Sequence, residues 1–427
     1  MKISISGIRG IFGSDLTLDT ILLFAKRFSS LLKSKGINRC VVGMDTRESS
    51  KIISNVAISA LLTYGINVYN LGIAPTPFIF RESRRYGAGL IITSSHNPLE
   101  WNGLKFVIEG RGLFEHELST LLNIEEPKSS SISKEEIIEP SYLNDISSLN
   151  ISANASIAID TAGGAAKEYA KILLENIGCK VYSINYEKAG YPDPTTNTLS
   201  NLSKTVRENN CSLGFAYDLD GDRLVVMDRY GNVLQPDTTL LLAIAKFASL
   251  GIKRFVVSVD TSNSIRDLVK SKGLSLIYSK VGEANVLRVM LENDIKVGGE
   301  GSSGGVIYAP FNMCRDGLLA SMIISSMINS KEYEECLNTK YTTIRTKFNI
   351  QSEIHDKVIG AIETKLEHDS YEISRLDGIK GFIDDNTWIL VRRSNTEDII
   401  RLSIESDNKT NANKLLKDYE NLIESTH

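Results

Sequence analysis

Three stretches of the chain share one order of hydrophobic and polar positions. In each, an apolar run ends in Asp, an amphipathic stretch is closed by Gly, and a second apolar run follows. The leading apolar runs of the three stretches are CVVGMD, SIAID and RFVVSVD, which end at Asp45, Asp160 and Asp260 respectively. Apolar residues three and four positions apart predict a helix, and Gly is a common helix stop. Strand, helix and strand, three times over, predict three related α/β units with buried, mainly parallel strands.

Polar segments predict where these units end. Residues 123–153 are rich in Ser, Glu and Lys, the third stretch begins after Leu250, and KEYEECLNTKYTT at 331–343 precedes a tail without the repeat. The tail has short alternating stretches, which predict a small α+β domain. We therefore predict an α/β fold with mixed, mainly parallel sheets in three domains and a C-terminal α+β domain. The predicted domains are residues 1–150, 151–250, 251–340 and 341–427.

Composition narrows the classes of partner. The 427 residues carry 48 Lys and Arg against 52 Asp and Glu, which gives a net charge of −4. No overall positive field would hold such a protein on nucleic acid or on an anionic membrane. The N-terminus MKISISGIRG has no apolar signal core, and every apolar run falls short of the ~18 residues of a membrane span. We expect a cytoplasmic protein that binds neither nucleic acid nor membrane.

The first chemically suggestive segment is SSHNP at residues 94–98, the serine loop, which follows the apolar run AGLIIT. A Ser between a buried strand and a turn ended by Pro is expected to be exposed, with a fixed backbone, which suits Ser95 as a nucleophile or phosphate carrier. His96 could orient it, and Lys105 could move a proton or neutralise a phosphate. An ordinary turn at a strand end, where Ser, Asn and Pro are common, is the alternative.

The second segment is DLDGDR at residues 218–223, the aspartate loop. Alternate side chains of an extended chain point the same way, so Asp218, Asp220 and Asp222 repel one another unless a hard cation binds. An EF-hand is excluded because Arg223 and Arg229 occupy the positions that need Gly and Glu. Open coordination positions predict Mg²⁺ completed by a phosphate, with Arg223 balancing charge or clamping substrate. A solvated acidic turn is the alternative.

Two further loops complete the set. GGEGSSGG at residues 298–305, the glycine loop, places Glu300 and Ser302 where backbone can approach a polyol closely, although an ordinary flexible turn also fits. RRSNTEDIIR at residues 392–401, the arginine loop, has the composition of a phosphate clamp, and a helix predicted to begin near Glu397 would add its amides. A helix cap beside surface arginines is the alternative. The predicted clamp residues are Arg392, Ser394, Asn395, Thr396 and Arg401.

Together these motifs resemble those of the α-D-phosphohexomutase superfamily, essentially end to end. The matching segments are SGIRG near the start, GMDTR at 43–47, APTP at 74–77, SSHNP with NGLK, DLDGDR, GGEGSSGG, RDG at 315–317 and RRSNTEDIIR. The resemblance implies four domains around one central cleft. It also implies an isomerase, an intramolecular phosphotransferase that interconverts the 1- and 6-phosphates of a hexose.

The resemblance implies a role for each candidate residue. Ser95 would carry the transferable phosphate and hold one Mg²⁺ per chain with Asp218, Asp220 and Asp222. Arg9 and Lys105 would assist proton movement and charge balance near Ser95, beside His96. Glu300 and Ser302 would contact sugar hydroxyls, while the clamp residues hold the phosphate that is not being transferred. The expected partner is a phosphosugar, with a sugar 1,6-bisphosphate as intermediate and activator, and the expected assembly is a monomer or homodimer.

Different motifs of the chain indicate different hexose substrates. Glu283 and Ala284 stand where many relatives of the mannose and glucose branch have a basic residue, which resembles glucosamine-type members, whereas SNTE resembles the mannose and glucose type. In the glycine loop, Gly304 or Gly305 replaces the His that ends this loop in many relatives. We expect a phosphoglucomutase/phosphomannomutase. A phosphoglucosamine mutase and a non-catalytic sugar-phosphate-binding relative are the alternatives.

Overall fold

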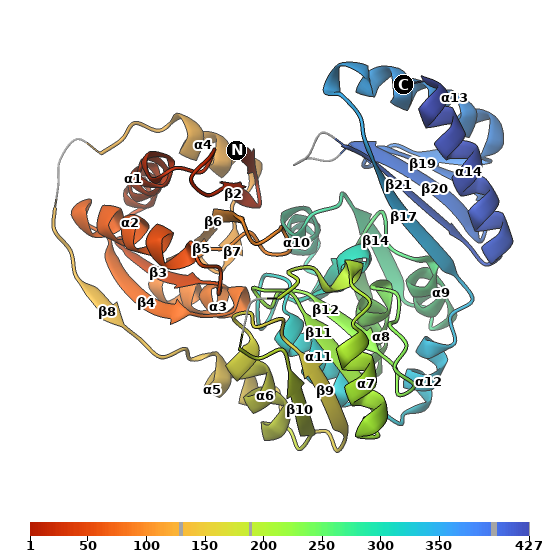
Figure 1. Cartoon of the computed structure of the whole chain (residues 1–427), viewed down its shortest axis with the longest axis horizontal. Coiled ribbons are helices and arrows are strands. Elements are labelled where there is room, and N and C mark those ends of the chain that lie inside the picture. Colours follow the sequence, from red (N-terminus) through yellow and green to blue (C-terminus); the bar gives the residue numbers. More distant parts are fainter. Residues whose placement is uncertain (128–130, 188–189, 394–398, 427) are drawn as a thin grey trace.

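The computed structural model describes residues 1–127, 131–187, 190–393 and 399–426, which fold into four units, each built on one sheet (Figure 1). The units follow one another along an arc, with the second and third between the first and the fourth. Among the helices of these residues, none has both the length and the apolar character needed to cross a membrane.

The described part of the first unit contains an eight-stranded sheet in the order β1-β2-β6-β5-β3-β4-β8, with β7 paired to β6. Its first helix begins after Thr17, whose side chain accepts a hydrogen bond from the amide of Thr20, and buries an apolar stripe that includes Ile21 and Phe28. Its elements are β1 Lys2–Ser4, β2 Gly7–Ile11, α1 Leu18–Ser34, β3 Arg39–Met44, α2 Ser50–Thr63, β4 Asn67–Ile73, α3 Thr76–Tyr86, β5 Ala88–Ile92, β6 Trp101–Ile108, β7 Arg111–Gly112, α4 Glu115–Asn123, β8 Glu135–Ile137 and α5 Tyr142–Ser147.

The second and third units have four-stranded sheets in the described residues, ordered β10-β9-β11-β12 and β14-β13-β15-β16. The second unit comprises β9 Ser156–Asp160, α6 Lys167–Asn176, β10 Lys180–Ile184, the 3₁₀ turn η1 Pro194–Thr196, α7 Ser200–Glu208, β11 Leu213–Tyr217 and β12 Leu224–Met227. The third comprises α8 Asp237–Ser249, β13 Arg254–Ser258, α9 Asn263–Ser271, β14 Ser275–Ser279, α10 Glu283–Glu292, β15 Val297–Glu300, η2 Gly301–Ser303, β16 Gly305–Tyr308, α11 Gly317–Ser325 and α12 Lys331–Leu337.

The predicted threefold repeat is confirmed, since the first sheet contains the same arrangement as β4-β3-β5-β6. In each copy three parallel strands are followed by an antiparallel one. The serine, aspartate and glycine loops all lie where the third parallel strand leads into the antiparallel strand. The repeat therefore places three chemically distinct loops at equivalent edges of related sheets.

Helix α8 bears on where the third domain begins. It packs on β15, β16 and η2 as well as on β12, and it precedes the boundary predicted near residue 250. We propose that the third domain begins before α8.

The fourth unit is an antiparallel sheet, β17-β21-β20-β19-β18, covered by α13 and α14 (Figure 1). The prediction of a helix beginning near Glu397 is wrong, because Ile399–Ser406 forms strand β21. Ile400, Leu402 and Ile404 alternate along it into the core, and β-branched residues favour strands. The elements are β17 Thr342–Asn349, η3 Ser352–Ile354, α13 His355–Asp369, β18 Glu372–Ser374, β19 Ile379–Asp384, β20 Thr387–Arg393, β21 Ile399–Ser406 and α14 Lys409–Thr426.

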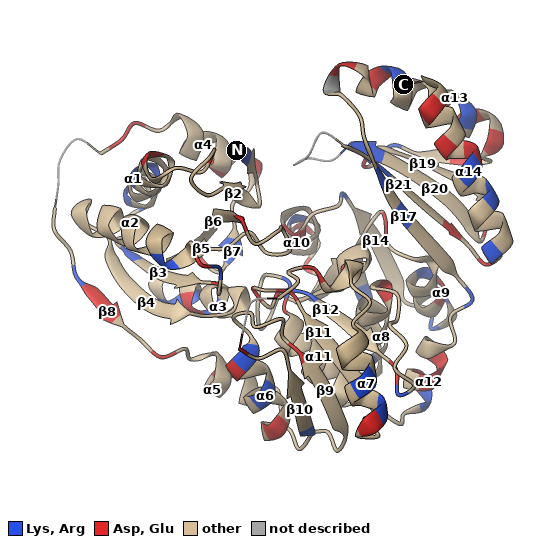
Figure 2. Cartoon of the chain, viewed as in Figure 1, with Lys and Arg blue, Asp and Glu red and all other residues tan. Residues whose placement is uncertain are grey.

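One hydrophobic cluster runs through the first three units, from Phe78 on α3 through Phe215 on β11 to Leu319 on α11. Within that cluster, the Tyr142 hydroxyl donates to both carboxylate oxygens of Asp316 at 2.8 Å, which ties α5 to α11. The fourth unit has its own core and meets the third where Trp388 contacts Val259. Figure 2 shows Lys, Arg, Asp and Glu mixed along α12, α13 and α14. The shared core makes the first three units a common platform for their loops.

Glu117 on α4 gives a pH test of the first unit. Arg111 donates two hydrogen bonds to its carboxylate at 2.7 and 3.0 Å, and the amide of Phe114 donates a third at 3.0 Å. Burial raises the pKa of Glu117, but Arg111, the Phe114 amide and Lys35 outweigh burial and lower this pKa from 4.5 to about 2. The ionised carboxylate therefore stabilises the fold above pH 4.5, and that contribution is lost as pH falls toward 2.

Glu117→Gln is expected to lower the free energy of unfolding by about 2 kcal/mol near neutral pH, with the deficit shrinking as pH falls below 4.5. Thermal unfolding of parent and variant across this pH range measures the difference. Glu115→Gln, on the exposed side of the same helix, is the control and should behave like the parent. A Glu117→Gln deficit that does not change with pH would contradict the argument.

Candidate active site

The serine loop and the aspartate loop meet directly. Ser95 Oγ donates a hydrogen bond to Asp218 Oδ2 at 2.8 Å. Lys105, on β6 beside the serine loop, donates to Asp220 Oδ2 at 2.7 Å and to Asp222 Oδ2 at 3.3 Å. All three hydrogen bonds join residues more than a hundred positions apart, so the packing of two units creates the cluster.

Ser95 is fully buried rather than exposed, so the sequence-based expectation of an exposed hydroxyl is wrong. The aspartate loop covers it, and Asp218, rather than His96, orients its hydroxyl. Its φ of 50° lies in the left-handed region, a conformation that costs a non-glycine residue of order 1–3 kcal/mol. Its amide donates to Thr93 Oγ1 at 2.8 Å. Such a conformation persists only when its surroundings enforce it.

Arg47 helps to hold the backbone of the serine loop in this conformation, although no role was predicted for it from the sequence. Its guanidinium donates to the backbone carbonyls of Ser95 at 2.6 Å, Asn97 at 2.7 Å, Trp101 at 3.0 Å and also Pro98. Its Nε donates to Asp45 Oδ2 at 3.0 Å, which fixes the side chain. The signal was the GMDTR motif, but only the pairing of β3 with β5 brings it beside the serine loop.

The three aspartates of the aspartate loop form a compact buried cluster. Each offers an oxygen within 4.8 Å of the others, and each is at most 1% exposed. Thr76, in the APTP motif, donates to Asp220 Oδ2 at 2.7 Å, another contact that the sequence did not predict. Asp220 Oδ1 and Asp222 Oδ1 are buried and have no hydrogen-bond partner among the described residues. Unpartnered carboxylate oxygens beside a hydroxyl are a donor set that fits a hard cation such as Mg²⁺.

The charges of this cluster are partly balanced. Burial, with Asp220 and Asp222, raises the pKa of Asp218 well above its usual value. Burial also raises the pKa values of Asp220 and Asp222, but Lys105 outweighs it at Asp220, and Arg315 with Lys105 outweighs it at Asp222, so both pKa values lie below the usual range. Burial lowers the pKa of Lys105, but Asp220 and Asp222 outweigh burial and raise this pKa overall, so the ammonium stays charged. Lys105 and Arg315 therefore balance the charges of Asp220 and Asp222.

Two further cationic groups, Arg9 and Arg223, lie near the aspartate triplet. Arg9 donates to Asn97 Oδ1 at 3.0 Å, and burial lowers the pKa of Arg9 to about 10. Arg9 Nε and Arg223 Nε are buried without a hydrogen-bond partner in the described chain. Burial, followed by Arg223 and Arg9, lowers the pKa of His96 well below 6.5, so its imidazole is neutral at neutral pH. Arg223 Nε lies 3.9 Å from both Asp218 Oδ2 and Asp222 Oδ1, and buried guanidinium donors that make no hydrogen bond are suited to an anion.

The glycine loop reaches this cluster through Arg315. Glu300 Oε2 accepts a hydrogen bond from Arg315 Nη1 at 3.0 Å, and its Oε1 accepts one from the amide of Gly282 at 2.7 Å. Arg315 Nη2 also donates to Asp222 Oδ2 at 2.7 Å. The guanidinium of Arg315 thus links Glu300 to Asp222. Arg315 belongs to the RDG motif, whose contacts could not be predicted from spacing.

Arg392, at the start of the arginine loop, lies near Asp260 of the third unit. Arg392 on β20 and Arg401 on β21 are directly opposite each other in the strand register. Burial raises the pKa of Asp260, but Arg392 and Arg345, with the hydroxyls of Ser258 and Ser302, outweigh it and lower that pKa. Arg392 and Ser302 are therefore both near the end of β13. The other predicted clamp residues, Ser394, Asn395 and Thr396, lie outside the described residues.

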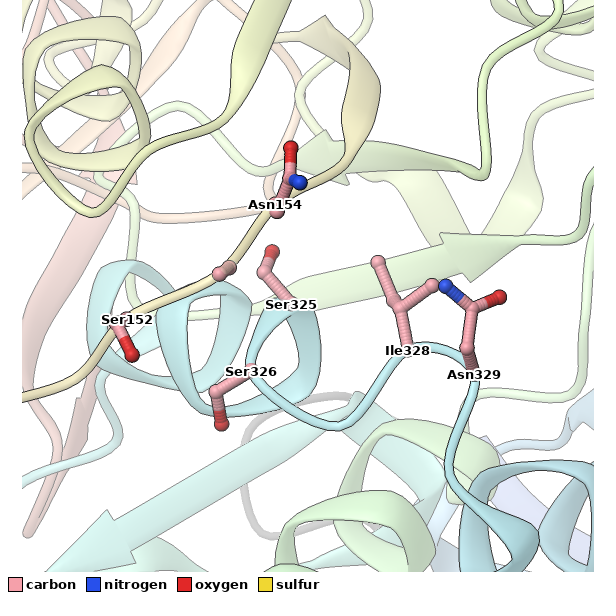
Figure 3. A pocket seen from close by; sticks show the side chains of 7 residues that line it. Ser152, Asn154, Ser325, Ser326, Ile328 and Asn329 are labelled. Carbon is pink, nitrogen blue, oxygen red and sulfur yellow. The ribbon is translucent and has the colours of Figure 1, made fainter.

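A separate hollow of about 450 Å³ lies between the segment before β9 and the end of α11 (Figure 3). It is lined by Ser152, Ala153, Asn154, Ser325, Ser326, Ile328 and Asn329. None of these seven carries a charge or a strong nucleophile, so the chemistry is concentrated at the serine and aspartate loops.

Models of the phosphoglucomutase/phosphomannomutase family match three parts of the chain. The models of α/β/α domains I, II and III match residues 1–126, 140–231 and 235–344. The third match begins just before α8.

Relatives match nearly the whole chain. The phosphoglucomutase/phosphomannomutase of Thermococcus kodakarensis is 33% identical over 440 residues, covering 96% of both chains. A protein of Methanobrevibacter smithii described as a "probable phosphoglucosamine mutase" is 30% identical over 434 residues, covering 95% of both.

Solved structures share the fold. A phosphoglucomutase/phosphomannomutase family protein from Burkholderia thailandensis has a TM-score of 0.87 at 21% identity, covering 99% of this chain and 98% of that one. The Aspergillus fumigatus N-acetylphosphoglucosamine mutase, in complex with GlcNAc-6P and magnesium, has a TM-score of 0.64 at 13% identity, covering 100% and 96%. The resemblance seen in the motifs is confirmed. The chain belongs to the phosphoglucomutase/phosphomannomutase family within the α-D-phosphohexomutases, which are isomerases.

Proposed function

We propose that the chain is a Mg²⁺-dependent phosphohexomutase that interconverts hexose 1-phosphates and 6-phosphates. Catalysis would proceed through phosphorylated Ser95 and a bisphosphorylated sugar. The observation that carries the proposal is the hydrogen bond of 2.8 Å from Ser95 Oγ to Asp218, which places a hydroxyl inside a buried carboxylate triplet. Phosphoryl transfer depends mainly on positioning and on stabilising charge, and this cluster supplies both.

The surroundings of Ser95 support a phosphate at its oxygen. A phosphoserine carries about −1.5 to −2 charges near neutral pH. The Nε groups of Arg9 and Arg223, which make no hydrogen bond to the described residues, are donors for such an anion. Because the triplet would repel it, Asp218, Asp220 and Asp222 together with the phosphate would hold Mg²⁺. The ion would neutralise charge on the phosphoryl group as it moves between oxygens.

We assign the proton transfers to Lys105 and His96. In the first step, a free hydroxyl of the hexose phosphate attacks phosphorus, its new O–P bond forms, and the bond from phosphorus to Ser95 Oγ breaks. Lys105, kept protonated by the aspartates, gives a proton to the departing Ser95 oxygen. Neutral His96, whose Nδ1 lacks a partner among the described residues, takes the proton of the sugar hydroxyl. The reverse transfers return the other phosphate to Ser95.

The bisphosphate must present both of its phosphates to Ser95 in turn, so the remaining contacts must accept two orientations. Arg392 and Arg401, paired across β20 and β21, would hold the phosphate that is not transferred, together with Ser394, Asn395 and Thr396. Glu300 and Ser302 would contact sugar hydroxyls. A sugar 1,6-bisphosphate would act as activator because it phosphorylates Ser95 in an enzyme that has lost its phosphate.

Glucose or mannose phosphate is the substrate that we propose first, following the Thermococcus kodakarensis relative described as a phosphoglucomutase/phosphomannomutase. Relatives described as probable phosphoglucosamine mutases support glucosamine phosphate as the alternative. Glu283 of this chain, which stands where many relatives of the mannose and glucose branch have a basic residue, supports it as well. The intact Ser95 and aspartate triplet argue against a protein that only binds sugar phosphates.

A comparison of substrates tests this proposal. Turnover of glucose, mannose and glucosamine 1-phosphates would be measured in coupled assays with Mg²⁺ and a catalytic amount of the matching 1,6-bisphosphate. We expect kcat/KM for glucose or mannose 1-phosphate to exceed that for glucosamine 1-phosphate by about tenfold or more. A preference for glucosamine 1-phosphate would establish the alternative. Absence of turnover with all three, while they still bind, would indicate a non-catalytic relative.

A further inference from the structure

Arg315, between β16 and α11, contacts carboxylates from three separate segments. Its Nη2 donates to Asp222 Oδ2 at 2.7 Å and its Nη1 to Glu300 Oε2 at 3.0 Å. Its backbone amide donates to Glu283 Oε2 at 2.8 Å, and its Nε lies 3.4 Å from the same oxygen. The side chain is 11% exposed. One planar guanidinium therefore joins the aspartate loop of the second unit to the glycine loop of the third.

Two glycines make this position possible. A Cβ at residue 305 would overlap Arg315 Cδ, so a side chain there and Arg315 cannot occupy their places together. A Cβ at Gly317 would lie 2.7 Å from the carbonyl oxygen of Arg223, and the Gly317 amide donates to Gly221 O at 3.2 Å. The RDG segment is therefore packed against the backbone of the aspartate loop, which leaves Arg315 little freedom.

The two terminal nitrogens of the Arg315 guanidinium bind two carboxylates with different proposed roles, Asp222 in metal binding and Glu300 in sugar binding. Asp222 Oδ2 accepts hydrogen bonds from Arg315 and Lys105, whereas Asp222 Oδ1 accepts none from the described residues and lies 3.9 Å from Arg223 Nε, which leaves it available to a cation. Glu300 is held by the same guanidinium and by the Gly282 amide. A change in the bond between Glu300 and Arg315 therefore alters how firmly Arg315 holds Asp222.

We propose that Arg315 is a positioning residue that couples the sugar contact at Glu300 to the Mg²⁺ site at Asp222. The inference rests on the proposed function, in which Glu300 contacts a hydroxyl and Asp222 a metal. A hydroxyl that takes Glu300 away from Arg315 lets the guanidinium hold Asp222 more tightly. Sugar recognition and the charge at the phosphoryl site then change together.

A simpler role would be to neutralise three buried carboxylates, and Arg315→Lys separates the two roles. Lysine keeps the positive charge, but its single ammonium is a point charge without the planar fork that spans Asp222 and Glu300. Glu300→Asp likewise keeps its charge while shortening the side chain, so that its bond to Arg315 is broken. Neither variant changes the net charge of the site, so a Coulomb effect alone should leave Mg²⁺ affinity nearly unchanged.

The test is a double-mutant cycle on Mg²⁺ affinity, measured by titration calorimetry with the full chain. Glu300→Asp is expected to weaken Mg²⁺ binding by about fivefold in the parent and to have almost no effect when Arg315→Lys is already present. Equal effects of Glu300→Asp in both backgrounds, or no effect in either, would overturn the coupling. If the parent protein neither binds Mg²⁺ nor turns over any hexose phosphate, the proposed function itself fails.

Gly305→Ala tests the same inference without altering a charged residue. The added methyl should displace Arg315, so Gly305→Ala is expected to change Mg²⁺ affinity and to abolish the effect of Glu300→Asp on it, as Arg315→Lys does. Gly360→Ala on α13, where an added Cβ meets nothing within 4 Å, is the matched control and should behave like the parent. Parent-like Mg²⁺ affinity in a folded Gly305→Ala protein would contradict the inference.

Discussion

Ser95→Ala is expected to reduce mutase turnover by at least about a thousandfold, because it removes the only oxygen proposed to carry the phosphoryl group. The fold should remain, since the hydroxyl makes one hydrogen bond, to Asp218, and Arg47 holds the loop by its backbone. Intact-protein mass spectrometry gives a second readout. The parent treated with a sugar 1,6-bisphosphate should gain the mass of one phosphoryl group, and the variant should not.

Ser94→Ala is the matched control for this prediction. Ser94 is the neighbouring serine, and its hydroxyl donates to Asn97 Oδ1 at 3.1 Å rather than to an aspartate. This variant should still be phosphorylated at Ser95 and keep most of its turnover. Full turnover of Ser95→Ala in the presence of a sugar 1,6-bisphosphate would remove Ser95 from the mechanism.

Asp220→Asn is expected to lower turnover by at least about a hundredfold at saturating Mg²⁺. The substitution keeps the volume of the side chain, but it removes a charged oxygen proposed to bind the metal and weakens the contact of 2.7 Å with Lys105. Chelation of Mg²⁺ should depress the parent's turnover equally, and added Mg²⁺ should restore it. The fold should survive, because the hydrophobic clusters of the four units do not depend on the triplet.

Asp228→Asn is the control, since Asp228 lies on an exposed turn after β12 and hydrogen-bonds to Tyr230 and Asn232. It should leave turnover unchanged. Thermal unfolding distinguishes the possible roles of the metal. If Asp220→Asn or chelation lowers the Tm as severely as the activity, the triplet stabilises the fold and the metal is structural rather than catalytic.

The fold was largely predictable because its information is local. Amphipathic spacing and the Asp and Gly positions marked the three repeats, and each became two parallel strands around a helix. The failure at Ile399–Ser406 is also local in origin. A polar cluster resembling a helix cap outweighed an alternation of Ile400, Leu402 and Ile404 that is typical of a strand.

The classes of chemistry could be recognised in the sequence alone: a serine in a turn, three alternating aspartates, a glycine-rich loop and paired arginines each fall within about ten residues. Four contacts became known from the folded chain: Ser95 is buried against Asp218, Arg47 binds the backbone of its loop, and Arg315 bridges Asp222 and Glu300. These contacts join residues 123, 48, 93 and 15 positions apart. Side-chain periodicity describes only neighbours along one element, whereas partners on different elements depend on how the sheets pack and which edges they share.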